Sequence, residues 1–158
     1  MNYTKRTLEN LSGLNKKFRV LIETFLQRSD AIAKEFNITI EILSGYRSSA
    51  QQAALYAQGR TKPGKIVTKA KSGTSFHNYG IAVDLGLFCD GKYLDKTNPV
   101  RADRIYKQLA IIAESLGIEW AGNWKTFSET PHFQKTYGMT ISQLREKLAQ
   151  VGDIQKLI

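Results

Sequence analysis

The stretch Ser75-Phe76-His77-Asn78-Tyr79-Gly80-Ile81-Ala82-Val83-Asp84 contains one of only two histidines in a chain of 158 residues. The other histidine lies in Glu129-Thr130-Pro131-His132-Phe133-Gln134. Each histidine is therefore accompanied by a carboxylate a few residues away. We interpret the two segments as the halves of one metal site, and the rest of the chain as the scaffold that brings them together.

The residue types favour zinc. Zinc in hydrolases is held by a few nitrogen and oxygen ligands, and one coordination position stays open for water. His77, Asp84 and His132 meet this need, and Gly80 would let the backbone turn between the first two. Zinc lowers the pKa of a bound water to roughly 7, which makes hydroxide available at neutral pH.

A carboxylate is still needed to accept the proton of that water. Glu129 lies three residues before His132 and is the candidate general base, and Pro131 argues against a regular helix there. Each residue also has an ordinary structural alternative. Either histidine could be a hydrogen-bonded structural residue, Asp84 a buried cap and Glu129 a surface charge.

Length and composition indicate one globular domain over residues 1–158, with 42% hydrophobic and 23% charged residues. The single cysteine, Cys89, cannot form an internal disulfide. The polar start has no apolar segment of a secretory signal, and no run of about 18 apolar residues occurs. We therefore expect no membrane span and a protein that stays in a cytoplasm until it is released.

The net charge of +9 indicates an attraction for polyanions. No acidic residue occurs between Glu41 and Asp84. The alternative explanation of this basic span is a solvated loop with a chance excess of lysine. The basic residues of this span are Arg47, Arg60, Lys62, Lys65, Lys69 and Lys71.

The hydrophobic pattern predicts helices and strands in alternation. A helix is expected over residues 15–36, followed by a strand over 38–42. Ser48-Ser49-Ala50-Gln51 is typical of a capping box and opens a helix that Gly59 would end. Residues 60–76 are expected to form a long loop.

The second half is expected to begin with a central strand over residues 81–88 and a hairpin turn at Asp90-Gly91. The later elements are a helix over 101–116, short strands over 118–120 and 132–134, and a helix from the capping box at Thr140 to about Gln150. This mixture predicts an α+β domain, a mostly antiparallel sheet with flanking helices.

The motifs resemble those of a known family. Ser75-x-His77-x-x-Gly80-x-Ala82-x-Asp84 is similar to the SxHxxGxAxD signature of the zinc D-alanyl-D-alanine carboxypeptidase and L-alanyl-D-glutamate endopeptidase group, whose fold the hedgehog signalling domain shares. The similarity covers roughly residues 38–135, and 136–158 would be a C-terminal helical segment. The further matching segments are Ser44-Gly45-Tyr46-Arg47-Ser48 with Gln52 and Leu55-Tyr56, Trp120-Ala121-Gly122-Asn123-Trp124, and Glu129-x-Pro131-His132-Phe133.

The resemblance implies a role for each matching residue. His77, Asp84 and His132 would bind zinc, and Glu129 would act as general base and then as general acid. Arg47 would stabilise the oxyanion or hold a substrate carboxylate. Substrate contacts are also expected from Gln52, Ser75, Tyr79 and Trp124, with core packing as the alternative for the two aromatic residues and a turn cap for Ser75.

The short form most resembles phage lysis enzymes, the L-alanyl-D-glutamate peptidases. The first hypothesis is therefore a monomeric zinc peptidase that cuts the stem peptide of peptidoglycan and is stored in the host cytoplasm before lysis. A D-alanyl-D-alanine carboxypeptidase would use the same zinc chemistry. One departure is Ala121, which replaces the first glycine of the usual Trp-Gly-Gly turn.

A second hypothesis is a non-catalytic basic protein that binds wall polymer or nucleic acid, since the net charge is +9. The sequence has no helix-turn-helix spacing, no zinc-finger cysteines and no interleaved basic and aromatic residues. We therefore expect no nucleic-acid partner.

Overall fold

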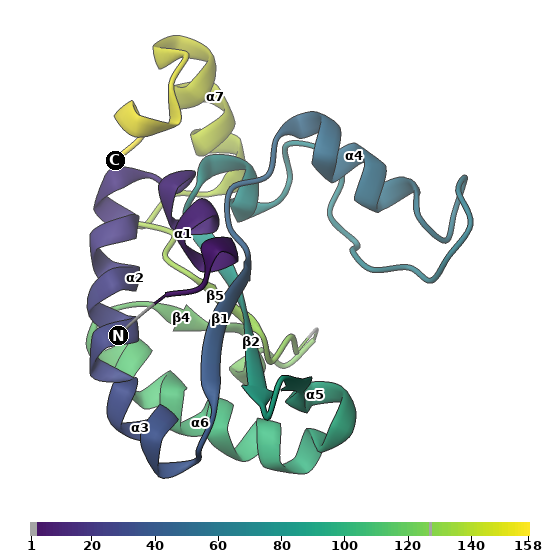
Figure 1. Cartoon of the computed structure of the whole chain (residues 1–158). Coiled ribbons are helices and arrows are strands. Elements are labelled where there is room, and N and C mark those ends of the chain that lie inside the picture. Colours follow the sequence, from purple (N-terminus) through teal and green to yellow (C-terminus); the bar gives the residue numbers. More distant parts are fainter. Residues whose placement is uncertain (1–2, 127) are drawn as a thin grey trace.

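The computed structural model describes residues 3–126 and 128–158 and is organised around an antiparallel sheet (Figure 1). The strand order is β1-β2-β5-β4, and β3 pairs with the end of β2. This arrangement confirms the predicted α+β class. The strands are β1 (Thr39–Ser44), β2 (Ala82–Cys89), β3 (Lys92–Tyr93), β4 (Glu119–Trp120) and β5 (His132–Gln134).

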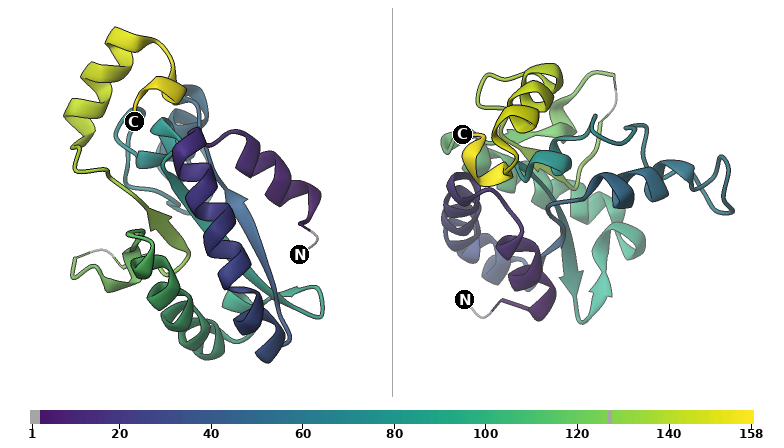
Figure 2. Two further views of the ribbon diagram at one scale, coloured as in Figure 1. Left: turned by 90° about the vertical axis from the view of Figure 1, so that its left-hand side faces the viewer. Right: turned by 90° about the horizontal axis from the view of Figure 1, so that it is seen from above.

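Helices flank the sheet (Figure 2). The α-helices are α1 (Lys5–Ser12), α2 (Lys16–Arg28), α3 (Asp30–Glu35), α4 (Ser49–Ala57), α5 (Leu94–Thr97), α6 (Pro99–Ser115) and α7 (Ile141–Val151). Short 3-10 helices are η1 (Phe76–Tyr79), η2 (Ala121–Asn123) and η3 (Ile154–Lys156). In the described part of the chain, no helix is both long enough and apolar enough to cross a membrane.

Phe133 lies at the centre of the core. Its ring centroid is 5.4 Å from that of Phe25 on α2, and 6.5 Å from those of Tyr106 on α6 and Trp120 on β4. Val83, Phe133 and Trp120 form a register row across β2, β5 and β4. Because side chains alternate along a strand, the residues next to this row point to the opposite face of the sheet.

The predicted helix over residues 15–36 is two helices, so its continuity was wrong. Ser29 separates α2 from α3, and its buried hydroxyl donates a hydrogen bond of 2.8 Å to the carbonyl of Phe25. A serine that bonds back to the preceding turn bends a helix. Apolar spacing continues across the bend, because both helices pack on the same core, and spacing alone does not reveal the break.

The caps and turns agree with the sequence. Ser48 and Gln51 form a reciprocal capping box at the start of α4, and Thr140 and Gln143 form another at α7. The turn between β2 and β3 places Asp90 and Gly91 at φ of 49° and 72°. Two successive positive φ angles are those of the hairpin turn that an Asp-Gly pair favours.

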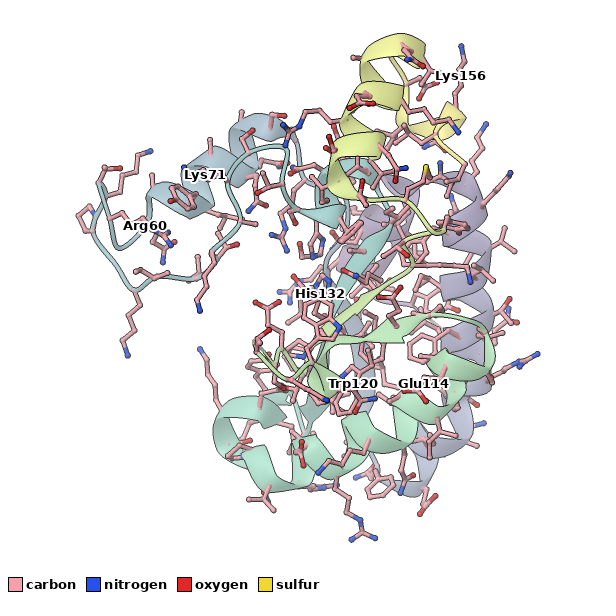
Figure 3. All side chains as sticks on the ribbon, turned by 180° about the vertical axis from the view of Figure 1, so that it is seen from behind. Arg60, Lys71, Glu114, Trp120, His132 and Lys156 are labelled. Atoms are coloured by element: carbon pink, nitrogen blue, oxygen red, sulfur yellow. The ribbon has the colours of Figure 1, made fainter. Side chains whose placement is uncertain are left out.

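Helix α4 and the following loop project from the body as an arm (Figure 1), which we define as residues 49–74. The arm contains most of the basic residues of the acid-free span, including Arg60 and Lys71, which lie far from His132 in Figure 3. Arg60 donates hydrogen bonds to the carbonyls of Tyr56 and Thr68, at 2.6 and 3.0 Å. These bonds tie the loop back to its own helix.

The C-terminal segment packs against the beginning of α2. Asn15 donates to the carbonyl of Ile154 at 2.6 Å, and the side-chain oxygen of Gln155 accepts from the amide of Lys16 at 2.8 Å. Gln155 also donates to the carbonyl of Leu14 at 3.0 Å. The helical segment predicted beyond residue 135 is thus bonded to the body.

Candidate metal centre

The sheet brings two of the candidate ligands together. Asp84 on β2 pairs with His132 on β5 on one side and with Ser44 on β1 on the other. This row lies next to the Val83–Phe133 pair, so it faces away from the core. Directly opposed residues on antiparallel strands have Cβ atoms about 4.5–5.5 Å apart. The pairing therefore accounts for the approach of two residues that are 48 positions apart.

The third candidate, His77, comes from η1, just before β2. Ser75 accepts a hydrogen bond from the amide of His77 and, with Asn78, forms a capping box. Gly80 ends the short helix at φ 67°, a left-handed conformation. A Cβ at Gly80 would lie 2.8 Å from the backbone nitrogen of Asn15. The turn therefore requires glycine, as its place between the two ligands predicted.

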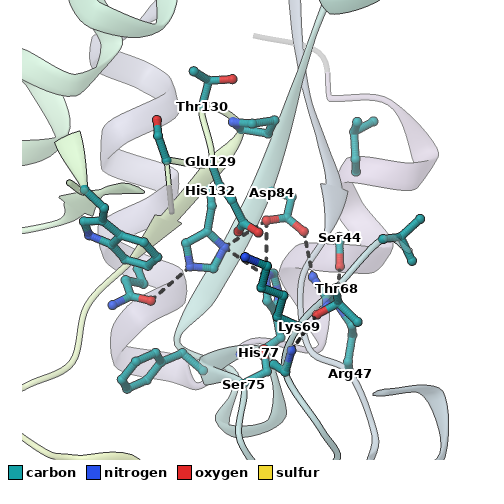
Figure 4. Close-up of a pocket in the computed structure, with 18 of the residues that line it drawn as sticks. Ser44, Arg47, Thr68, Lys69, Ser75, His77, Asp84, Glu129, Thr130 and His132 are labelled. Atoms are coloured by element: carbon teal, nitrogen blue, oxygen red, sulfur yellow. Dashed lines mark hydrogen bonds and ion pairs between the residues drawn. The ribbon is translucent and has the colours of Figure 1, made fainter. Parts of the chain in front are cut away.

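Three donor atoms converge at this point (Figure 4). Nε2 of His77 lies 3.2 Å from Oδ1 of Asp84 and 3.3 Å from Nδ1 of His132, and the last two atoms are 3.0 Å apart. Ligands about 2.0–2.2 Å from zinc in a tetrahedron are roughly 3.3–3.6 Å from one another. The three residues form a group that could hold one metal ion.

Both imidazoles have a hydrogen-bond partner on the nitrogen that faces away from the donor triangle. Nδ1 of His77 lies 2.7 Å from the carbonyl oxygen of Gly45, and Nε2 of His132 lies 3.0 Å from Oε1 of Gln134. A backbone carbonyl accepts only, so His77 carries its proton on Nδ1. Such partners fix the orientation and the tautomer of metal-binding histidines.

The charges of the group also suit a cation. Burial lowers the pKa of His77 below its usual value, against the opposing effect of Asp84. Burial disfavours ionisation of Asp84, but the two imidazoles hold the pKa of that carboxyl well below its usual value. For His132, the effect of burial is outweighed by the hydrogen bond and charge of Asp84, which raise its pKa. Asp84 is consequently ionised at neutral pH.

Each of the three guanidinium nitrogens of Arg47 has a side-chain partner. Its Nη2 lies 2.7 Å from Oδ2 of Asp84, Nε donates to Ser44 at 2.9 Å, and Nη1 donates to Gln52 at 3.0 Å. Arg47 therefore occupies the second oxygen of Asp84 and leaves Oδ1 to face the histidines.

The donors lie in an open cavity of about 910 Å³. Ser75, Trp124 and Glu129 line it, and so does Lys69 from the arm. Figure 4 shows Glu129 and Lys69 reaching toward the donors from two different loops. The amide of Glu129 donates to Ala121 at 3.2 Å and its carbonyl accepts from His132 at 3.1 Å, so its backbone is held on both sides.

Two predicted contact residues lie behind the cavity wall. Gln52 is fully buried and bonds Arg47 and the carbonyl of Ala70, which joins the arm to the site. Tyr79 is 1% exposed, and its hydroxyl donates to the carbonyl of Gly73 at 2.9 Å. For Tyr79 this is the core-packing alternative. Neither residue is among the described residues that line the cavity.

The sequence interpretation missed Gln134 and Glu119, and it named Lys69 only as one of the basic residues of the acid-free span. Alternation along His132-Phe133-Gln134 could have identified Gln134, because it shares a face with His132. Glu119 pairs with Gln134 across β4 and β5, and its Oε2 accepts a hydrogen bond of 3.2 Å from Gln134. That pairing joins segments that are distant in the sequence, so no local sequence pattern predicts it.

Two histidines and one aspartate in a cavity with a further carboxylate are typical of the site of a mononuclear metallohydrolase. The comparisons with known proteins agree. A family model described as D-alanyl-D-alanine carboxypeptidase, of the M15 peptidases, matches residues 68–135. The chain is 40% identical over 118 residues to the peptidoglycan L-alanyl-D-glutamate endopeptidase CwlK of Bacillus subtilis (strain 168), over 68% of this chain and 69% of CwlK.

It is also 29% identical over 135 residues to the L-alanyl-D-glutamate peptidase of Listeria phage A118, over 85% of this chain but only 42% of the phage protein. The crystal structure of the Serratia marcescens L-Ala D-Glu endopeptidase ChiX has the same fold, with a TM-score of 0.54 and 24% identity over 87% of this chain and 91% of ChiX. The chain therefore belongs to the M15 peptidase family. It is a zinc metallopeptidase, and the family resemblance predicted from the motifs is confirmed.

Proposed function

We propose that this chain is an L-alanyl-D-glutamate endopeptidase that cuts the stem peptide of peptidoglycan. The similarity to CwlK supports the choice of bond, because the alignment extends over 69% of that enzyme. The observation that carries the proposal is the convergence of Nε2 of His77, Oδ1 of Asp84 and Nδ1 of His132, at 3.0–3.3 Å, in a cavity that Glu129 also lines.

In this proposal His77, Asp84 and His132 hold the zinc through the three converging atoms. When bound, zinc supplies a Lewis acid and lowers the pKa of a water molecule in the site. The ionised carboxylate of Asp84 favours the cation, and the imidazoles offer it their lone pairs. The bonds to Gly45, Gln134 and Arg47 hold the three side chains in position before the metal arrives.

Glu129 is proposed to move the protons. Its carboxylate accepts a proton from the attacking water as the new carbon–oxygen bond forms. It then donates that proton to the amide nitrogen as the carbon–nitrogen bond breaks, so the leaving group departs as a neutral amine. The backbone bonds of Glu129 to Ala121 and His132 keep the carboxylate beside the metal ligands.

Arg47 is proposed to act through Asp84, because its guanidinium nitrogens bond Asp84, Ser44 and Gln52. Lys69 is the other lysine or arginine among the described residues that line the cavity. A glutamyl residue retains one free carboxylate whichever of its two carboxyls forms the chain. We propose that the ammonium of Lys69 attracts this carboxylate to the cavity.

The alternative is a D-alanyl-D-alanine carboxypeptidase, the description of the matching family model. Both activities need the same ligands and general base. Digestion of purified peptidoglycan followed by mass spectrometry of the fragments separates them. New amino-terminal D-glutamate supports the endopeptidase, whereas release of single D-alanine residues supports the carboxypeptidase. Intact peptidoglycan after incubation with the zinc-loaded protein would contradict both.

We also propose that residues 1–158 act as one monomeric catalytic unit in phage-type lysis. The described elements share one hydrophobic core, which supports a single catalytic unit. The similarity to a peptidase of a Listeria phage supports a role in phage-type lysis. Storage in the host cytoplasm before lysis remains a prediction. The test of this role in lysis is to express the chain in host cells with and without a membrane-permeabilising protein and to measure the loss of turbidity of the culture.

A further inference from the structure

We propose that Gln52 is a positioning residue that holds residues 67–70 in place and thereby places Lys69 in the cavity. We call residues 67–70 the arm wall, because they return from the tip of the arm and line the cavity. The inference rests on the proposed function in one respect, since it takes Lys69 to attract a carboxylate of the substrate. The position of the arm wall itself can be measured without any substrate.

The arm wall belongs to no helix or strand, so individual hydrogen bonds decide where it lies. Arg60 donates to the carbonyl of Thr68 at 3.0 Å, but it also bonds Tyr56 on α4. That link therefore stays within the arm and does not fix the arm wall to the body of the protein.

Gln52 provides a link to the body. It lies in α4 at the base of the arm, and its side chain is fully buried. Its Oε1 accepts a hydrogen bond of 3.0 Å from Nη1 of Arg47. Its Nε2 donates to the carbonyl of Ala70 at 2.8 Å and to the hydroxyl of Thr68 at 3.4 Å. Gln52 thus bonds the residues on both sides of Lys69, whose side chain reaches toward the donors (Figure 4).

Arg47, at the other end of this link, is fixed by the metal group and by the body. Its guanidinium bonds Asp84 at 2.7 Å. Its amide donates to the carbonyl of His77 at 3.0 Å, and its carbonyl accepts from Asn78 at 2.8 Å. Through Gln52, the arm wall is therefore referred to the same residues that form the metal group.

The two ends of the Gln52 carboxamide cannot exchange. A guanidinium only donates, so the oxygen of Gln52 must face Arg47, and a backbone carbonyl only accepts, so the NH₂ group must face Ala70. Both partners call for the same orientation. Because the side chain is fully buried, a partner that is lost is not readily replaced by water. A change at the NH₂ end alone should release the arm wall and leave Arg47 bonded.

The substitution Gln52→Glu makes this change without altering the length of the side chain. One carboxylate oxygen still accepts from Arg47, and the other lies against the carbonyl oxygen of Ala70, where two acceptors repel. Gln51→Glu is the matched control, because it makes the same charge change at the neighbouring, exposed residue. Oε1 of Gln51 accepts from the amide of Ser48 at 2.8 Å, and a glutamate retains that bond.

A second variant covers the case in which the buried carboxylate of Gln52→Glu prevents folding. Gln52→Met also lacks the donor to Ala70 and brings no charge into the buried position. It removes the acceptor of Arg47 as well, so only the position of the arm wall is measured with it.

Limited digestion of the zinc-loaded full chain with trypsin reads the position of the arm wall. The rate of cleavage between Lys69 and Ala70 is followed by mass spectrometry, with the bond after Lys107 on α6 as a reference for the global fold. We expect cleavage after Lys69 to be at least about tenfold faster in Gln52→Glu and Gln52→Met than in the wild type and Gln51→Glu, because proteolysis follows the population of the open form. Cleavage after Lys107 should not change.

Hydrolysis of the L-Ala–D-Glu stem peptide provides the second readout. In Gln52→Glu we expect KM to rise roughly five- to tenfold and kcat to stay within about threefold, because Lys69 is displaced while the metal group keeps its bonds. In a Lys69→Met background the same substitution should change KM by less than about twofold, since coupled residues are not additive.

Equal cleavage after Lys69 in Gln52→Glu and Gln51→Glu would overturn the inference, and for Gln52→Met the comparison is with the wild type. A rise in KM that is as large with Lys69→Met as without it would also overturn it, as would a fall in kcat at constant KM. If Gln52→Glu releases the arm wall but the wild type cuts no stem peptide, the positioning role is upheld and the proposed function fails.

Discussion

Replacing Glu129 by glutamine removes the proposed proton carrier and little else. The side chain keeps its length and shape, and the loop is held by backbone bonds that the substitution leaves intact, from Glu129 to Ala121 at 3.2 Å and from His132 to Glu129 at 3.1 Å. Glu129 is not a member of the candidate metal-binding group, which consists of His77, Asp84 and His132. Zinc content and folding should therefore match those of the wild type.

The expected loss is one of rate. General acid–base help by a positioned side chain is typically worth 10²–10⁴-fold, which corresponds to about 2.7–5.5 kcal/mol of barrier. Glu129 is proposed to act in both proton transfers, so we expect kcat for the Glu129→Gln protein to fall toward the upper end of this range. KM should change far less, because glutamine still fills the same part of the cavity wall.

The assay follows hydrolysis of a synthetic L-Ala–D-Glu stem peptide by chromatography, with zinc measured in each preparation by atomic emission. Glu114→Gln is the matched control, because Glu114 is a glutamate on α6 whose carboxylate bonds Asn123. Full zinc content with activity within about threefold of the wild type would refute the role of Glu129. Loss of zinc in Glu129→Gln would show that the residue acts on the metal and not on the proton.

Three further predictions concern the scaffold, the charge of the cavity and pH. Gly80→Ala, at φ 67° and with 2.8 Å between the new Cβ and the amide nitrogen of Asn15, should lower the free energy of unfolding by more than the roughly 1–2 kcal/mol of left-handed backbone strain. Gly138→Ala, at φ 73° with open space around it, should lose only the strain in denaturant titrations, and equal losses would contradict the steric argument. Lys69→Met should lower kcat/KM for the carboxylate-bearing peptide while sparing its carboxamide analogue, and an equal loss for both would exclude a contact with the carboxylate. Asp95→Asn should raise the melting temperature at pH 7, because burial raises the pKa of Asp95 and makes its ionised form unfavourable in the folded protein. This gain in melting temperature should fade as the pH falls toward about 4, the pKa of an aspartate in the unfolded chain. A gain that does not change with pH would contradict this reasoning.

The sequence predicted the parts of this fold that local chemistry controls. The capping boxes at Ser48 and Thr140 are present, and so are the turn at Asp90-Gly91 and the left-handed Gly80. Each depends on hydrogen bonds or backbone angles within a few residues. The departure at Ala121 is accommodated, since Ala121 is fully buried and is not among the described residues with positive φ.

What the sequence could not show depends on long-range pairing. The approach of Asp84 to His132 follows from the register of β2 with β5, and the hydrogen bond between Gln134 and Glu119 follows from the register of β4 with β5. Helix α1 was missed because its face toward the sheet has few apolar residues, with Thr7 and Leu11 as its buried side chains. The hydrogen bonds of Arg47 to three partners could not be predicted from the sequence either, because Ser44, Gln52 and Asp84 come together only in the folded chain.

The central claim is that one zinc ion is held by two imidazoles and one carboxylate, with a position left for water. Zinc X-ray absorption of the purified protein tests it most directly. The account predicts one zinc per chain, with two imidazole nitrogens at about 2.0–2.1 Å and oxygen ligands at about 2.0–2.2 Å. A sulfur ligand near 2.3 Å, which Cys89 would have to supply, or a first shell with fewer than two imidazoles, would contradict it.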